Sequence, residues 1–138
     1  MKKAPTFELQ SIDGRFHHLE DFRGKHVILT FWASWCPDSA RDLPKKEQLY
    51  DSMDHDNVEM ITINVVGRER DEQAGITYAN KYLSQLTLLD DGRKTYDVYQ
   101  CQGVPTTVLI NKQGELVEQF GDKANMMDIV QAIGNKLL

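Results

Sequence analysis

The chain has 138 residues, of which 41% are hydrophobic, 16 are basic and 21 are acidic, and its formal net charge is −5. This length suits a single domain, and we expect residues 1–138 to form it without a disulfide framework. The scattered basic residues argue against a nucleic-acid partner. Two cysteines are too few for a four-cysteine zinc site, and the four histidines lack metal-ligand spacing. We therefore expect neither a metal nor an organic cofactor.

The longest apolar stretch covers residues 27–33, which is far short of the roughly 20 residues that span a bilayer. No apolar segment follows the charged start Met1-Lys2-Lys3, so a signal peptide is not predicted. These features predict a cytoplasmic protein, which we expect to be a monomer. The alternative is an extracytoplasmic protein whose membrane anchor is not part of the sequence.

The first part of the chain predicts a hairpin, a buried strand and a helix. Asp13-Gly14 between alternating segments indicates a β-hairpin, and residues 19–24 predict one helical turn that stops at a glycine. Residues 27–32 show no polar alternation, which is typical of a strand covered on both faces. A helix is predicted from residue 37 to about residue 53, with a kink at the internal Pro44.

The second part alternates strands and helices. Residues 58–66 predict a buried strand, residues 67–71 a charged loop, and residues 72–82 a helix with Ala74, Tyr78 and Tyr82 on one face. A short strand is predicted at 86–89 and a helix at about 93–99. A buried strand at 106–110 is predicted to pair with a strand at 116–120 through a turn at Gln113-Gly114. The apolar positions of the last helix, at about 124–137, are Met126, Ile129, Val130, Ile133 and Leu137. This order predicts a mixed α/β sheet with helices on both faces.

Two distant segments carry the residues suited to chemistry. Cys36 lies between the predicted central strand and the helix that Pro37 opens, where unpaired N–H groups and the helix dipole favour a thiolate. The segment Gly103-Val104-Pro105 opens a buried strand, where a proline normally removes a ladder hydrogen bond. We therefore predict a cis peptide bond before Pro105.

These segments resemble the thioredoxin fold, and within it the TlpA/ResA-type thiol-disulfide oxidoreductases, which are related to the AhpC/TSA group. The likeness runs from Ala4-Pro5-Thr6-Phe7 through Trp35-Cys36-Pro37 to Lys112-Gln113-Gly114. It implies a thioredoxin-like sheet with an N-terminal hairpin and a central βα insertion. It also implies that Cys36 is the nucleophile, that Val104 and Pro105 pair with the substrate backbone, and that Trp35 and Pro37 adjoin the substrate.

Three features depart from the family pattern. Ser39 replaces the second cysteine, and its hydroxyl is too weak a nucleophile to cleave a disulfide, so it could only hydrogen-bond the Cys36 thiolate. Asp38 places a carboxylate near that thiolate, opposing the helix dipole. Thr30 stands where thioredoxin has a buried aspartate.

Asp42 matches an acidic position of TlpA-type relatives and is a candidate proton relay. The alternative is a solvated carboxylate among Arg41, Lys45 and Lys46. Cys101, four residues before Pro105, also has two interpretations. It is either a buried packing residue or a relocated redox partner that closes a disulfide with Cys36.

The sequence thus predicts a thiol-disulfide oxidoreductase with isomerase-like exchange. Cys36 would form mixed disulfides with a disulfide-containing protein or a low-molecular-weight partner, and an external thiol would release them. A peroxiredoxin-like thiol peroxidase is one alternative, although Leu29 and Ala33 replace the proline and threonine of that group. A redox-inactive thioredoxin-like module that holds extended peptides at Trp35, Val104 and Pro105 is the other.

Overall fold

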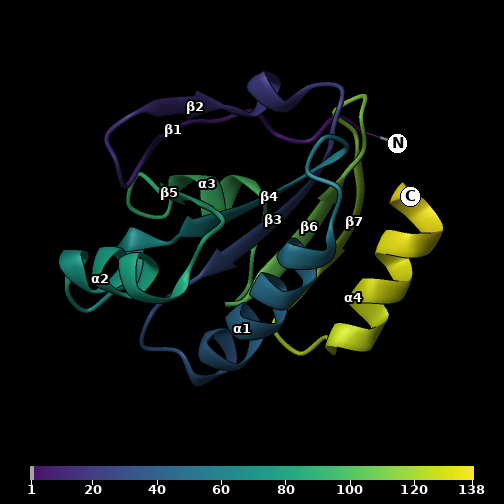
Figure 1. Ribbon diagram of the computed structural model, residues 1–138. Helices are drawn as coiled ribbons and strands as arrows, with labels where there is room; N and C mark the ends of the chain where they lie inside the picture. The colour runs from purple at the N-terminus through teal and green to yellow at the C-terminus, as the bar shows by residue number, and fades with distance from the viewer. Residues whose placement is uncertain (1) are drawn as a thin grey trace.

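The strands of this computed structural model, which describes residues 2–138, form one seven-stranded sheet (Figure 1). The strand order is β2-β1-β5-β4-β3-β6-β7. The strands are β1 Glu8–Ser11, β2 Phe16–His18, β3 His26–Trp32, β4 Val58–Asn64, β5 Leu86–Leu89, β6 Thr106–Ile110 and β7 Leu116–Phe120. The helices are α1 Pro37–Ser52, α2 Glu72–Tyr82, α3 Lys94–Val98 and α4 Met126–Ala132, with short helical turns η1 Leu19–Phe22, η2 Val66–Arg68 and η3 Ile133–Leu137.

The central strands β3, β4 and β5 run parallel to one another. Helices α1 and α2 make the parallel crossovers between them, and β6 and β7 add antiparallel strands beside β3. The opening hairpin joins the sheet through β1, which lies antiparallel to β5. The predicted mixed α/β sheet with an N-terminal hairpin is therefore confirmed.

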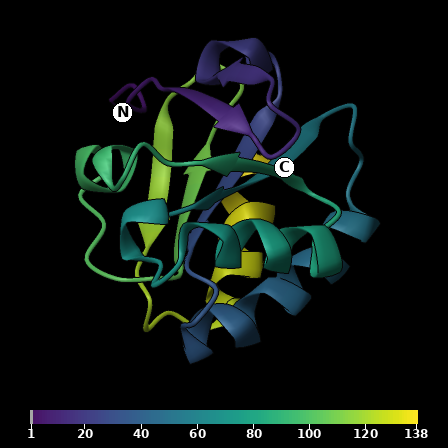
Figure 2. The same ribbon diagram turned by 90° about the vertical axis from the view of Figure 1, so that its left-hand side faces the viewer.

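Alternate residues of β3 face opposite sides of the sheet, and both sides are covered. Leu29 and Phe31 pack in the core beneath η1 and α3, whereas Ile28 packs against α4 and the end of α1. Trp32 lies between α1 and α2. Figure 2 shows α3 and α1 on opposite sides of the strands. Burial on both faces explains why this strand shows no polar alternation in the sequence.

The buried face of α2 differs from the predicted one. Gly75 and Ala79 face the core, whereas Tyr82 is 55% exposed. The cause is the close approach of Asn64, because a Cβ at position 75 would lie only 2.2 Å from Asn64 Oδ1. Small residues therefore take the core side of this helix, and the bulky tyrosine lies outside it.

The last helix also differs in part. Val130 is 41% exposed, while the preceding Ile129 occupies the core position. A helix buries a single stripe, and neighbouring residues are turned about 100° apart around its axis. The helix continues into a π-helical turn, η3, which keeps Ile133 and Leu137 buried. Among the described residues, no helix combines the length and the apolar character needed to cross a membrane.

Candidate active site

Cys36 lies where the chain leaves β3 and enters α1. It is the N-cap residue of the helix, with an extended backbone, and Pro37 takes the first helical position. The Cys36 carbonyl accepts the Ala40 N–H at 3.0 Å, while the Cys36 N–H donates to the Ala33 carbonyl at 3.3 Å. The predicted position at a helix N-terminus, where the helix dipole favours a thiolate, is therefore observed.

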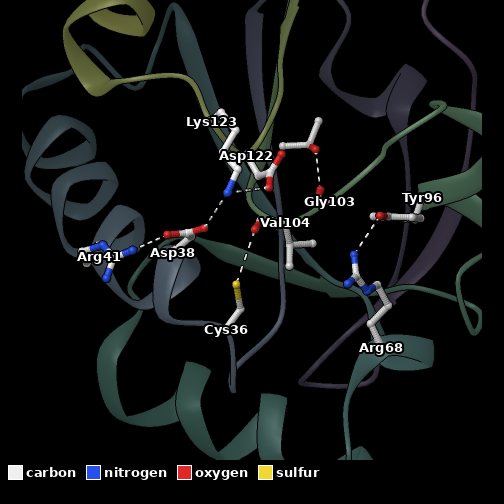
Figure 3. Close-up of polar contacts among 10 residues, drawn as sticks. Cys36, Asp38, Arg41, Arg68, Tyr96, Gly103, Val104, Asp122 and Lys123 are labelled. Carbon is white, nitrogen blue, oxygen red and sulfur yellow. Dashed lines mark hydrogen bonds and ion pairs between the residues drawn. The ribbon is translucent and has the colours of Figure 1, made fainter.

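The cis-proline loop meets the cysteine from the other side. The Val104–Pro105 peptide bond is cis, as predicted. The Cys36 thiol donates a hydrogen bond to the Val104 carbonyl, with the sulfur 3.4 Å from the oxygen (Figure 3). Thr106 Oγ1 donates to the Gly103 carbonyl at 2.7 Å and fixes the loop. Two segments 68 residues apart thus enclose one sulfur atom.

Ser39 occupies the position of the missing second cysteine. It is 1% exposed, and its Oγ accepts the N–H of Ala33 at 3.4 Å. Within residues 2–138, Ser39 makes no hydrogen bond to the Cys36 sulfur. The bond that the sequence allowed is absent because the serine oxygen faces the end of β3 and the thiol faces Val104.

Asp42 and Lys46 form an ion pair on α1. Lys46 is fully buried, and its Nζ lies 3.1 Å from Asp42 Oδ2, 3.0 Å from Thr30 Oγ1 and 2.8 Å from Thr107 Oγ1. Burial lowers the pKa of Lys46, and the Asp42 carboxylate acts in the opposite direction. The expectation that Lys46 is one of several solvated charges was wrong. Lys46 lies three residues after the buried Leu43, and this spacing puts both side chains on the core face of the helix.

The Asp42 side chain is only 12% exposed, so the alternative of a solvated carboxylate was also wrong. Asp42 and Pro105 line one cavity of about 170 Å³. Asp38 lines the same cavity, and its carboxylate pairs with Arg41 and with Lys123, whose Nζ is 4.0 Å from Oδ2 (Figure 3). Two cations therefore offset the charge that was expected to oppose a Cys36 thiolate.

Cys101 lies in the core beneath α3. Its N–H donates to the Tyr96 carbonyl at 3.0 Å, and both its thiol and that of Cys36 are free. Burial raises the pKa of Cys101 to about 12, and a hydrogen bond with Thr106 only partly opposes this effect. A thiol with such a pKa stays protonated at neutral pH and is a poor nucleophile. This favours the packing interpretation of Cys101 over a relocated redox pair.

The loop after β4 holds the segment that precedes Cys36. The Glu69 carboxylate accepts hydrogen bonds from the Ser34 N–H at 2.7 Å, the Ser34 hydroxyl at 2.6 Å and the Asn64 amide at 2.7 Å. The Trp35 indole N–H donates to the Arg68 carbonyl at 2.5 Å, and the ring is 40% exposed. Sequence reasoning missed these contacts because Glu69 lies 35 positions after Ser34.

This combination of fold and cysteine matches known proteins. The model of the AhpC/TSA family matches residues 1–119. The chain belongs to the AhpC/TSA family. Within this family it is 34% identical to the thiol-disulfide oxidoreductase ResA of Halalkalibacterium halodurans over 118 residues. The matched segment covers 85% of this chain and 65% of the relative. The sporulation thiol-disulfide oxidoreductase A of Bacillus subtilis is 32% identical over 113 residues, 80% of this chain and 67% of the relative.

Solved structures of the same fold agree with this family. The pneumococcal exposed lipoprotein thioredoxin Etrx1 of Streptococcus pneumoniae superposes with a TM-score of 0.81 at 28% identity, covering 94% of this chain and 98% of the other. The predicted thioredoxin-like fold and the ResA-type resemblance are thus confirmed. This AhpC/TSA-family chain spans about two thirds of the length of the curated relatives it matches.

Proposed function

We propose that this chain is a monothiol thiol-disulfide oxidoreductase in which Cys36 Sγ is the exchanging sulfur. The observation that carries the proposal is the contact between this thiol, at the start of α1, and the cis-proline loop. The position of the expected second sulfur holds the Ser39 hydroxyl, which is bound to a backbone amide. The names of ResA and of the sporulation oxidoreductase support this reaction class.

In the proposed reaction the Cys36 thiol first gives up its proton. The thiolate then attacks one sulfur of the partner's disulfide, so that a bond forms between Cys36 and this sulfur while the other sulfur leaves as a thiolate and is protonated. Ser39 cannot attack this mixed disulfide, so an external thiolate attacks the partner's sulfur and regenerates the Cys36 thiolate. The two exchanges leave the number of disulfides unchanged, which is isomerase-like behaviour.

The surrounding residues take three supporting roles in this proposal. Asp42 relays the proton, because its carboxylate opens onto the cavity that Pro105 also lines. Val104 and Pro105 present backbone to an extended partner next to the sulfur. The exposed Trp35 and the adjacent Pro37 complete the contact surface.

The partner class that follows is a disulfide-containing protein or a low-molecular-weight disulfide, bound by a monomer. The expectation of a cytoplasmic protein receives no support from the relatives. Etrx1 is an exposed lipoprotein, and disulfide substrates persist in oxidising compartments outside the cytosol. We therefore place the activity in an extracytoplasmic compartment.

Mass spectrometry after incubation with a neutral disulfide tests this mechanism. We expect a single adduct, on Cys36, that persists until an external thiol is added. Ser39→Cys should shed the adduct without an external thiol, because the new sulfur can attack the mixed disulfide. Cys36→Ala should remove the adduct, whereas Cys101→Ala should retain it.

Two of the alternatives predict different results for Cys36. A peptide linking Cys36 to Cys101 in the wild type would show a relocated redox pair and contradict the monothiol mechanism. Full biological activity in Cys36→Ala would instead support the redox-inactive peptide-binding module.

A further inference from the structure

The loop after β4 carries two arginines, Arg68 and Arg70, for which the proposed reaction has no use. They flank Glu69, whose carboxylate is already engaged within the protein. We propose that the guanidinium groups of Arg68 and Arg70 form a subsite that binds a carboxylate on the disulfide partner of Cys36. This inference rests on the proposed function and adds the charge of the preferred partner.

The backbone of this loop is held on both sides of Arg68. Before it, the Gly67 N–H donates to the Gly92 carbonyl at 2.7 Å, and a Cβ at position 67 would lie 2.8 Å from the Gly92 carbonyl carbon. After it, Glu69 makes its three hydrogen bonds to Ser34 and Asn64. The backbone that carries Arg68 is therefore fixed before a partner arrives, which reduces the entropy lost on binding.

Arg68 rests on Tyr96 and keeps most of its donors free. Its Nη1 donates to the Tyr96 hydroxyl at 2.8 Å, and its guanidinium carbon lies 5.5 Å from the ring centroid. A guanidinium has five N–H donors, and within residues 2–138 this is the only hydrogen bond of the Arg68 side chain. Figure 3 shows Arg68 and Tyr96 on one side of the contact between Cys36 and Val104. The remaining donors of Arg68 are thus free, and its backbone carbonyl contacts Trp35, the residue before the reacting cysteine.

Arg70 is linked to the residue immediately before the nucleophile. Its guanidinium carbon lies 5.6 Å from the centroid of the Trp35 ring, and the same indole donates to the Arg68 carbonyl. Among the ion pairs of residues 2–138, none includes Arg68 or Arg70. Arg68 and Arg70 are therefore cations without a salt-bridge partner, in a chain whose net charge is −5 and in which the acidic residues Asp71 and Glu72 follow directly.

A carboxylate is the ligand that fits this pair. The planar fork of N–H donors on a guanidinium matches the two oxygens of a carboxylate, and the bond is charge-assisted. Such a group can come from a small disulfide that carries carboxylates, such as oxidised glutathione. It can also come from an acidic residue beside a cysteine in a protein. Both sources share the same chemistry, and the experiment separates them.

The test compares two aromatic disulfides that differ in charge, and each variant is compared with wild type for the same reagent. Dithiobis(nitrobenzoate) carries a carboxylate on each ring, whereas dithiodipyridine is neutral. In Arg68→Gln/Arg70→Gln, we expect the rate constant of Cys36 to fall about fivefold with the anionic reagent and to stay within about twofold of wild type with the neutral one. Added salt should reduce the preference of the wild type for the anionic reagent.

Arg15→Gln is the control for a positive charge lost elsewhere on the surface. Arg15 is an exposed arginine on the opening hairpin whose side chain contacts Asp13, and its replacement removes one positive charge, whereas Arg68→Gln/Arg70→Gln removes two. It should leave both rate constants unchanged. Equal losses with the two reagents, or no loss with either, would overturn the subsite while leaving the proposed function intact. A wild-type Cys36 that reacts with neither reagent would overturn both.

Three further substrates identify the source of the carboxylate. They are oxidised glutathione and two peptide disulfides, one with Glu and one with Gln beside the cysteine. A loss in the double variant with glutathione disulfide alone assigns the subsite to small thiols. A loss with the Glu peptide but not with the Gln peptide assigns it to proteins. If neither arm distinguishes the double variant from wild type, the subsite does not exist.

Discussion

Replacing Lys46 with Met tests whether a buried ion pair holds α1 against the sheet. The substitution keeps an unbranched apolar side chain but removes the charge and its three donors. In the wild type these donors are satisfied by Thr30, Thr107 and Asp42, at 3.0, 2.8 and 3.1 Å. Without Lys46, the carboxylate of Asp42, which is 12% exposed, loses its partner.

The structure sets the size of this effect. Removing one partner of a buried ion pair costs about 3–5 kcal/mol, and since Asp42 keeps some contact with water, we expect the low end, about 3 kcal/mol. The hydroxyls of Thr30 and Thr107 add little, because these residues are cross-strand partners and one hydroxyl can donate to the other. Asp42→Leu/Lys46→Met removes both charges and should lose no more than about 1 kcal/mol.

Urea unfolding followed by tryptophan fluorescence measures these losses, because Trp32 is fully buried in the folded protein. Lys45→Met is the matched control, since the exposed neighbour should change the free energy of unfolding by less than about 0.5 kcal/mol. The reasoning fails if Lys46→Met costs no more than this control. It also fails if the double variant loses as much as the two single variants added together.

Two further substitutions test how the helices are attached. Burial alone would raise the pKa of Glu47, but hydrogen bonds from Ser84 and Gln85 together lower it below its usual 4.5. The stabilisation from these hydrogen bonds is present above pH 4.5 and is lost as the pH falls through the folded-state pKa of Glu47. Urea unfolding at decreasing pH should therefore show a fall in the free energy of unfolding that Glu47→Gln lacks. An equal fall in the two proteins would refute this. Gly75→Ala should lower the free energy of unfolding by about 1–3 kcal/mol through overpacking. Gly134→Ala should not, because outside its own stretch of helix no atom lies within 4 Å of the added Cβ, and equal effects of the two substitutions would contradict the packing argument.

Local patterns predicted the elements whose own residues decide their structure. The hairpin followed from Asp13-Gly14, and Gly14 indeed has a φ of 92°, where glycine is favoured. The central strand followed from an unbroken apolar run, because β3 is buried on both faces. The cis bond before Pro105 followed from a proline at the start of a buried strand. In each case the signal lay within a few residues.

The errors came from contacts between distant parts of the chain. Apolar spacing assigned Tyr82 and Val130 to the apolar faces of their helices, but the close approach of Asn64 and the packing of Ile129 decided which side of each helix is buried. Lys46 looked like a surface charge because its acceptors Thr30 and Thr107 lie on β3 and β6. A charged residue becomes compatible with the core only when such partners meet it, and the sequence pattern does not show this pairing.

The replacement of the second cysteine by Ser39 and the arginine pair bear on the same step. A dithiol site releases its partner from within, so the mixed disulfide is short-lived whatever else binds the partner. With one thiol, the mixed disulfide lasts until an external thiol reaches it. During that interval the noncovalent contacts around Cys36 decide how the partner is oriented and which of its sulfurs is open to attack. A subsite at Arg68 and Arg70 would therefore influence exchange more in this chain than in a relative with two sulfurs, and Ser39→Cys should weaken the dependence of product release on these arginines.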